Sequence, residues 1–399
     1  MSNGRALDLL NFFLADVRGG IGPYVNVFLL TEAGWTPEKI GAVLSLSGLL
    51  GIVVHAPVGA FIDETPHKRS LLAGASWILA LCGIGVAIWP SLPVVFAADA
   101  SMAALGAVFA PTVAAVSLGI VGRSGLAERT GRNAVFDKAG NLFIAGLAGA
   151  VGWLLGQRAV FFLLPFFALL ASMSVYAIPA QAIDHEIARG LTREDEARGA
   201  GPKAWRKLFK CRPFLVLATV TTLFHFANAP MIGLASQRLA LMAPGYESAT
   251  TSAAVVVAQL ATIPMAVLVT RADRLGAKTL LIIAFCALPL RGLAFALLSN
   301  PFAILGAQVL DGIGAGLFDV LLPLVLADAV RGLGRYNVSR GLISTIQGVG
   351  GASSYAAGGW LATNIGYTGA FLVLSGIACI ALAIAVVSLP ASARRQRIT

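Results

Sequence analysis

Charged residues are scarce in this sequence, and their scarcity limits the classes of protein that it fits. Only 12% of its 399 residues are Asp, Glu, Lys or Arg, whereas a soluble globular domain carries roughly 25%. Cysteine is also rare, and the four that are present are scattered without the spacing of a metal or redox motif. These absences argue against a soluble domain, a disulfide framework and a cysteine-bound metal.

Long apolar runs are what the sequence has instead. Hydrophobic residues make up 57% of it, and its mean hydropathy is +0.82. The runs show no period-2 alternation, which argues against an outer-membrane β-barrel. We therefore expect an all-α polytopic membrane protein, because runs of about 20 residues can each cross a bilayer as a helix. Twelve helices are expected, at roughly 8–31, 39–62, 69–89, 93–121, 134–157, 160–180, 213–241, 249–270, 278–298, 302–328, 339–363 and 368–390.

A short acidic-basic turn occurs twice, about 210 residues apart, and each copy follows an apolar run. Recurrence at one equivalent place in each half is typical of a duplicated membrane protein. A second repeated segment supports the duplication, since Gly152-Trp153 in the fifth predicted helix recurs as Gly359-Trp360 in the eleventh. The turn, called the gate motif below, consists of Gly59, Asp63, Lys68 and Arg69 in the first copy and Asp273, Arg274, Gly276 and Lys278 in the second.

The gate motif resembles the loop between the second and third helices of each half in the major facilitator superfamily. The family pattern reads G-x-x-x-D-R/K-x-G-x-R/K-R/K. The first copy departs from it at Glu64 and Pro66, and the second copy departs at Val269. The resemblance covers almost the whole chain. It implies two pseudo-symmetric six-helix bundles related by an internal repeat.

The resemblance also implies a domain arrangement and a role for the gate motif. Bundles at 1–180 and 213–399 are expected, joined by a cytoplasmic linker at 181–212 that is either an interfacial helix or a solvated tether. Asp63 and Asp273 would each meet a helix N-terminus of the opposite half, where the helix dipole favours an anion. The basic residues would meet inner-loop carboxylates and lipid phosphates. These contacts would close the inner side of the protein.

The basic residues indicate an orientation in the membrane. They concentrate in alternate loops, and one side of the predicted helices holds only Lys39, Arg158 and Arg238. Cytoplasmic loops are enriched in Lys and Arg. We therefore expect both termini in the cytoplasm, with the protein in a bacterial cytoplasmic (inner) membrane.

Charges inside apolar helices are costly, so they are the candidates for function. Asp16 and Arg18 lie near the middle of the first predicted helix, and each needs a partner on another helix or in water. Asp311 and Asp319 lie along one side of the tenth predicted helix, so their carboxylates could border one cavity. Asp311 is the best candidate for a coupling carboxylate. It carries a proton or is locked to Arg18, and the two roles are compatible if the pair breaks during transport.

Further candidates follow from the same argument. His225 lies at mid-depth in the seventh predicted helix and is either part of a proton path or a hydrogen-bonded packing residue. His55 is a weaker candidate of the same kind, and Asp99 is a further acid in the fourth helix. Arg291, in the ninth helix, is interpreted as a snorkelling or packing arginine. The expected substrate or proton cavity thus holds Asp16, Arg18, Asp99, His225, Asp311 and Asp319.

The family resemblance implies a secondary active transporter that works by alternating access. The buried acids are aspartates without an evident sodium site, which favours coupling to H⁺, and the apolar cavity favours export of a small hydrophobic or amphipathic solute. The alternatives are uptake of an organic solute, movement of a metal ion or chelate, and a membrane sensor.

The sequence has no nucleotide-binding loop and no hydrolase motif, so neither an ATP-driven pump nor an enzyme is expected. The expected partners are a small-molecule substrate, protons and membrane lipids. We expect no cofactor, no bound metal and no nucleic acid, and we expect a monomer.

Overall fold

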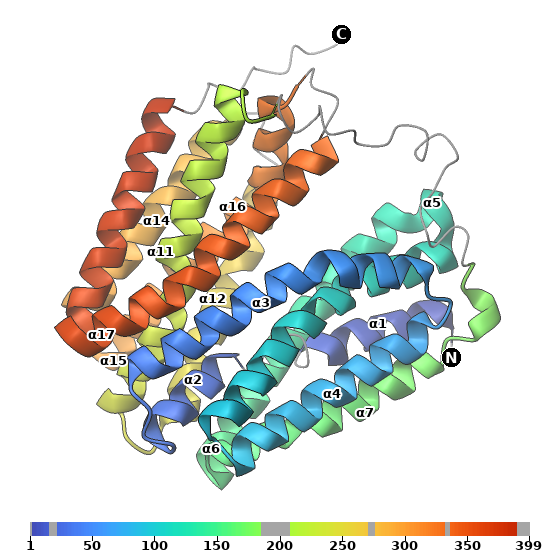
Figure 1. The fold of residues 1–399 in the computed structure, drawn as a ribbon, viewed down its shortest axis with the longest axis horizontal. Helices are drawn as coiled ribbons and strands as arrows, with labels where there is room; N and C mark the ends of the chain where they lie inside the picture. The colour runs from blue at the N-terminus through green and yellow to red at the C-terminus, as the bar shows by residue number, and fades with distance from the viewer. Residues whose placement is uncertain (1, 16–21, 185–207, 270–275, 332–335, 389–399) are drawn as a thin grey trace. The chain divides into compact units, whose positions relative to one another are not determined.

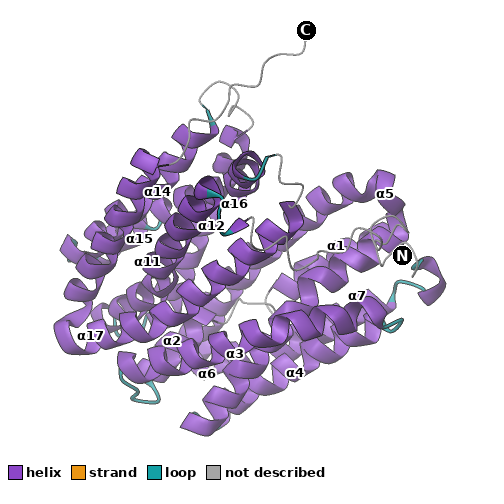
Figure 2. Ribbon diagram, turned by 45° about the horizontal axis from the view of Figure 1, so that its top comes forward, coloured by secondary structure: helices purple, strands orange, loops and turns teal. Residues whose placement is uncertain are grey.

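A computed structural model describes the chain except residues 1, 16–21, 185–207, 270–275, 332–335 and 389–399. Some helical residues, among them His55, Gly59 and Asp63, are described only as parts of their helix, and their surroundings are outside the description. The described part is helical and contains no strand (Figures 1 and 2). Its helices are α1 (Asn3–Ala15), α2 (Gly22–Thr31), α3 (Pro37–Glu64), α4 (Lys68–Ile88), α5 (Leu92–Leu155), α6 (Gln157–Phe161), α7 (Leu163–Tyr176), η2 (Ala180–Ala182), α11 (Arg212–Met242), α12 (Glu247–Val269), α14 (Ala277–Leu297), α15 (Pro301–Ala307), α16 (Val309–Ala329) and α17 (Tyr336–Ser388).

Ten helical stretches of the described residues are long and apolar enough to cross a membrane. Two of the long helices turn at a glycine with positive φ, Gly122 in α5 (φ 67°) and Gly366 in α17 (φ 74°), a conformation that favours glycine. The two parts of α5 are separate candidate spans, whereas α17 contains one stretch of 51 residues, enough for two crossings at about 20 residues each. With α1 and α2, which fall in the first predicted helix, this is consistent with twelve predicted helices.

The chain packs into two compact units. Unit 1 consists of Met1–Gly34, Leu46–Gly199 and Pro244–Ser252, and unit 2 consists of Trp35–Ser45, Ala200–Ala243 and Ala253–Thr399. The predicted linker falls mostly on 185–207, outside the described residues, although Leu208 is buried in the core of unit 2. The bundle boundaries expected from the sequence stay a prediction.

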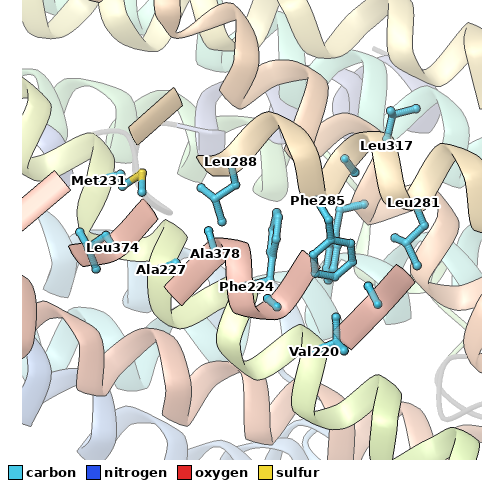
Figure 3. Packing of buried hydrophobic residues seen from close by; sticks show 14 of the residues in the cluster. Val220, Phe224, Ala227, Met231, Leu281, Phe285, Leu288, Leu317, Leu374 and Ala378 are labelled. Carbon is cyan, nitrogen blue, oxygen red and sulfur yellow. The ribbon is translucent and has the colours of Figure 1, made fainter. Parts of the chain in front are cut away.

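Each unit has its own apolar core. In unit 1 the core side chains come mainly from α1, α4, α5 and α7. In unit 2 they come mainly from α11, α14, α16 and α17 (Figure 3). There Phe224 stacks on Phe318 with ring centroids 4.8 Å apart, and Phe285 packs edge-on to Phe224 at 4.9 Å. Such aromatic pairs add specific geometry to the apolar packing of α11, α14 and α16.

A glycine lets α1 and α5 approach closely in unit 1. A Cβ atom at Gly140 would lie 2.2 Å from the carbonyl oxygen of Phe12, whereas a Cβ atom at Gly146, farther along α5, would meet no atom within 4 Å. We expect Gly140→Ala to lower the free energy of unfolding by about 1–3 kcal/mol through overpacking. Gly146→Ala is the matched control and should change stability by no more than about 1 kcal/mol. Thermal unfolding of the two purified variants checks this, and equal melting temperatures would contradict it.

Candidate functional site

An ion pair lies inside unit 2, within two of its candidate membrane spans, Ala277–Leu297 and Pro301–Ala329. Arg291 of α14 pairs with Asp311 of α16, and the two side chains are 1% and 18% exposed. The Nη2 of Arg291 donates to Oδ1 of Asn228 on α11 over 2.7 Å. One arginine therefore connects three helices by polar contacts. A charge at this depth is costly unless it is paired.

The backbone of α16 brings Asp311 to this place. Residue 312 is a glycine, and a Cβ atom there would lie 2.3 Å from the carbonyl oxygen of Ala258 on α12. This close approach packs α16 against α12 and leaves no room for a larger residue. One turn earlier, α15 ends and α16 begins at Gln308, whose carbonyl oxygen accepts from the backbone nitrogen of Asp311 at 3.0 Å.

Three polar atoms on these elements lack hydrogen-bond partners among the described residues. They are the side-chain nitrogen and oxygen of Gln308, which is fully buried, and Nε of Arg291. A buried polar group without a partner is costly. The polar network around Asp311 therefore has unsatisfied atoms, two donors and one acceptor. These atoms could bind a water, a solute, or protein groups that approach in another conformation.

The sequence analysis placed Asp311 correctly inside an apolar helix, and it considered Arg18 as a partner. In the structure the partner of Asp311 is Arg291, and Arg18 lies outside the described residues, as does Asp16. Arg291 itself was interpreted as a snorkelling or packing side chain. Snorkelling is wrong, because a residue that is 1% exposed does not extend to an interface.

His225 is tied to its own helix. Its Nδ1 lies 3.0 Å from the carbonyl oxygen of Thr221, which can only accept, so the proton of a neutral ring sits on Nδ1. The ring packs against Phe318 at 5.2 Å between centroids. Asp319, an exposed residue one position further along α16, acts on it electrostatically. These contacts are those of a packing histidine with one carboxylate near it.

The described basic residues of the gate motif bind backbone carbonyls. Lys68 is 2% exposed, and its Nζ donates to the carbonyl oxygen of Ile62 at 2.7 Å and of Thr65 at 3.1 Å. The Nη1 of Arg69 donates to the carbonyl oxygen of Ile178 at 2.7 Å. A cation at carbonyls near the end of a helix is favourable for the helix dipole. These contacts hold the end of α3 and the end of α7 beside α4.

The second copy of the gate motif is described in part. Gly276 has φ 81° and precedes α14, and Lys278 donates to the carbonyl oxygen of Val386 at 3.3 Å. Asp273 and Arg274 lie outside the described residues, and so do the side chain of Asp63 and the surroundings of Gly59. The role of the two aspartates therefore stays a prediction.

A further charged cluster, in unit 1, was missed by the sequence analysis. Asp8 of α1 is 4% exposed and binds two arginines of α5, Arg129 at 2.5 Å and Arg132 at 2.7 Å. Nε of Arg129 donates to Oδ1 of Asn133 at 2.7 Å. The signal available in the sequence was the Gly-Arg-Asn segment at 131–133, which has a counterpart at 334–337. The cluster ties the beginning of α1 to the middle of α5.

The remaining predicted acid, Asp99, lies in the first span of α5 beside Ser47 of α3. Among the described residues, no group of three or more His, Cys, Asp or Glu side chains is placed to hold a metal ion. The described site is therefore built from one buried ion pair in unit 2 and separate polar residues in other spans of the two units.

Comparisons with known proteins agree with this architecture. The sequence model of the Major Facilitator Superfamily matches residues 7–288 and 239–398. The uncharacterized MFS-type transporter Rv2456c of Mycobacterium tuberculosis is 37% identical over 387 residues, which cover 97% of this chain and 93% of that protein.

Two solved structures have the same fold. The nucleoside transporter NupG superposes with a TM-score of 0.79 at 14% identity, covering 97% of this chain and 98% of NupG. A D-xylose-proton symporter superposes with a TM-score of 0.71 at 15% identity, covering 98% of this chain and 97% of the symporter. The prediction of an all-α polytopic membrane protein is confirmed. With a family match along the chain and a relative of 37% identity over nearly all of it, this protein is a member of the major facilitator superfamily of membrane transporters.

Proposed function

We propose that the protein is a secondary active transporter that exports a small hydrophobic or amphipathic solute by alternating access, in exchange for protons. The observation that carries the proposal is the ion pair between Arg291 and Asp311, inside the spans of unit 2. Ionisable groups at such depth are expensive and default to roles in ion and substrate movement. Of the acids predicted to carry the proton, Asp311 has a cationic partner that can respond to its charge.

Asp311 would couple proton binding to a change of contacts. While it is ionised, it holds Arg291 against α16, and Arg291 holds Asn228 of α11. A proton on the carboxylate would remove the charge that neutralises Arg291, and the arginine would need another acceptor. The unpartnered side-chain oxygen of Gln308, one turn from Asp311, is a candidate. Protonation would thus favour a different packing of α14, α16 and α11.

The nature of the solute follows from what the spans contain. Transport of polar solutes is known in this fold, since structural neighbours carry nucleosides and D-xylose. Sugars call for many hydrogen-bonding side chains in a cavity, whereas this chain has few charges and many small and apolar residues in its spans. This composition favours an amphipathic or hydrophobic solute. Proton coupling has a precedent in the D-xylose-proton symporter.

Flux measurements in proteoliposomes test the proposal. The purified protein is reconstituted and given a panel of labelled solutes, comprising amphipathic cations, a nucleoside, a sugar and a divalent metal with a chelate, each with and without a pH gradient. We expect accumulation of an amphipathic solute that depends on the gradient and collapses with a protonophore. If only the sugar, the nucleoside or the metal moves, the proposed class of solute is wrong. If the flux is the same with and without the pH gradient, the proposed coupling to protons is wrong.

The proposed location has both termini in the cytoplasm of a bacterial inner membrane. Lys39 near the beginning of α3 and His67 just after its end are both exposed, so cysteines there report opposite faces. In a variant without native cysteines, an impermeant thiol reagent applied to right-side-out vesicles should label Lys39→Cys and spare His67→Cys. A permeant reagent should label both. The reverse pattern from outside would invert the proposed topology.

A further inference from the structure

An acid that has no cationic partner among the described residues, Asp99, lies in the first of the two spans of α5 in unit 1. Asp99 is the eighth residue of α5, roughly 10 Å along the helix from Leu92 at 1.5 Å per residue. It is half-buried, and among the described residues no basic side chain binds it or acts on it. It differs in this respect from Asp311, which is paired with an arginine.

The group that faces Asp99 is a hydroxyl. Ser47 of α3 is fully buried, and its side chain lies beside the Asp99 carboxyl. Its Oγ has no hydrogen-bond partner of normal geometry among the described residues. A buried hydroxyl without a partner is costly, and the carboxyl of Asp99 is the polar group within its reach. The Ser47 hydroxyl and the Asp99 carboxyl can therefore satisfy each other by a hydrogen bond.

The packing of α3 on α5 fixes this pair. One turn further along both helices, a Cβ atom at Gly51 would lie 2.6 Å from Cβ of Ala103. Such close approach leaves little space for another side chain between the helices at this level. On α4 the titratable Cys82 interacts with Ser101, two residues after Asp99. The described surroundings of Asp99 thus offer one hydroxyl and no charge.

A carboxyl group beside one hydroxyl and no cationic side chain has two ways to avoid an unneutralised negative charge. It can bind a metal cation or it can bind a proton. Hard cations take several oxygen ligands, typically six or more for the well-studied divalent ions, and one carboxyl with one hydroxyl supplies too few. A protonated carboxyl, in contrast, is a donor and an acceptor at once, and a serine hydroxyl can satisfy either role.

We propose that Asp99 is a proton-binding site of this protein, with Ser47 as its hydrogen-bond partner, and that it is protonated in the conformation described. Unit 1 would then hold a neutral acid while unit 2 holds an ionised one at Asp311. The use of this proton in transport rests on the proposed function. The protonation of Asp99 does not, because it can be observed without any solute.

Infrared spectroscopy of the reconstituted protein at neutral pH tests the site. We expect the carbonyl stretch of a protonated carboxylic acid in the wild type, its loss in Asp99→Asn, and a shift in its frequency in Ser47→Ala, which removes the hydrogen bond and keeps the acid. Asp311→Asn should leave the band in place. Persistence of the whole band in Asp99→Asn, or the absence of any such band in the wild type, would overturn the proposal. A loss of the band on adding Na⁺ at constant pH would make the site a cation site instead and would also overturn it.

A transport measurement then separates the two proposals. If the wild type moves solute with protons, Asp99→Asn should lower the number of protons moved per solute. An unchanged ratio would remove the transport role of Asp99 while the proposed function stands. If the infrared band behaves as expected and no solute of the panel moves in any variant, the proton site stands and the proposed function fails.

Discussion

Replacing Asp311 by asparagine is expected to abolish accumulation of solute driven by a pH gradient, while exchange of labelled for unlabelled solute continues. Asparagine is uncharged and can neither bind nor release a proton. The variant should therefore be unable to return with a proton in place of solute, whereas it should still move in both directions with solute bound. Accumulation should fall to the level seen without a gradient, and proteoliposomes assayed in both modes measure this.

A second acid, at the other end of the same helix, provides the control. Asp328 lies near the end of α16 in an exposed pair with Arg331, and such surface pairs contribute little. Asp328→Asn should accumulate solute as the wild type does. If Asp311→Asn also keeps full accumulation, then Asp311 is structural, and Asp16 or Asp319 becomes the candidate for coupling.

Replacing Arg291 by methionine should have the largest effect on stability. The change keeps an unbranched, though shorter, apolar chain and removes the charge that neutralises Asp311. It also leaves Oδ1 of Asn228 without its donor. Loss of one partner of a buried pair typically costs about 3–5 kcal/mol. We expect poor yield of the membrane-inserted protein and a markedly lower melting temperature in detergent.

A double variant distinguishes a stranded charge from a general packing defect. Arg291→Met combined with Asp311→Asn removes both charges, and neutral replacements of a buried pair are often tolerated. The double variant should therefore be more stable than Arg291→Met alone, although it should not accumulate solute. Arg331→Met, at an exposed arginine, should be close to wild type. If the double variant is no more stable than Arg291→Met, the energetic account of the pair is wrong.

Much of the fold could be predicted because apolar runs of bilayer length are a strong signal. The helices α4, α11, α12 and α14 lie within two residues of their predicted bounds. The turns inside the long helical stretches also agree with the prediction. Gly122 of α5 directly follows the predicted helix end at 121, and Gly366 of α17 lies between the predicted helices 339–363 and 368–390.

The candidate site was predictable only in part, for a physical reason. Sequence position gives the depth of a charge in a helix, and this singled out Asp311 and Asp99. It does not give the direction in which the side chain points or the helix that faces it. Arg291 was therefore interpreted as a snorkelling or packing arginine. Ser47 was not considered, because a serine in an apolar helix carries no signal until its neighbour is known.

The central claim is that proton movement and solute movement are coupled through Asp311 and its pair with Arg291. Recording both in the same proteoliposomes tests it most directly, with a pH-sensitive dye inside the vesicles and labelled solute outside. The account predicts that a solute gradient drives protons in the opposite direction through the wild type. It predicts no proton signal with Asp311→Asn, although labelled solute still exchanges. Solute movement in the wild type without a proton signal, or a wild-type proton signal with Asp311→Asn, would contradict the account.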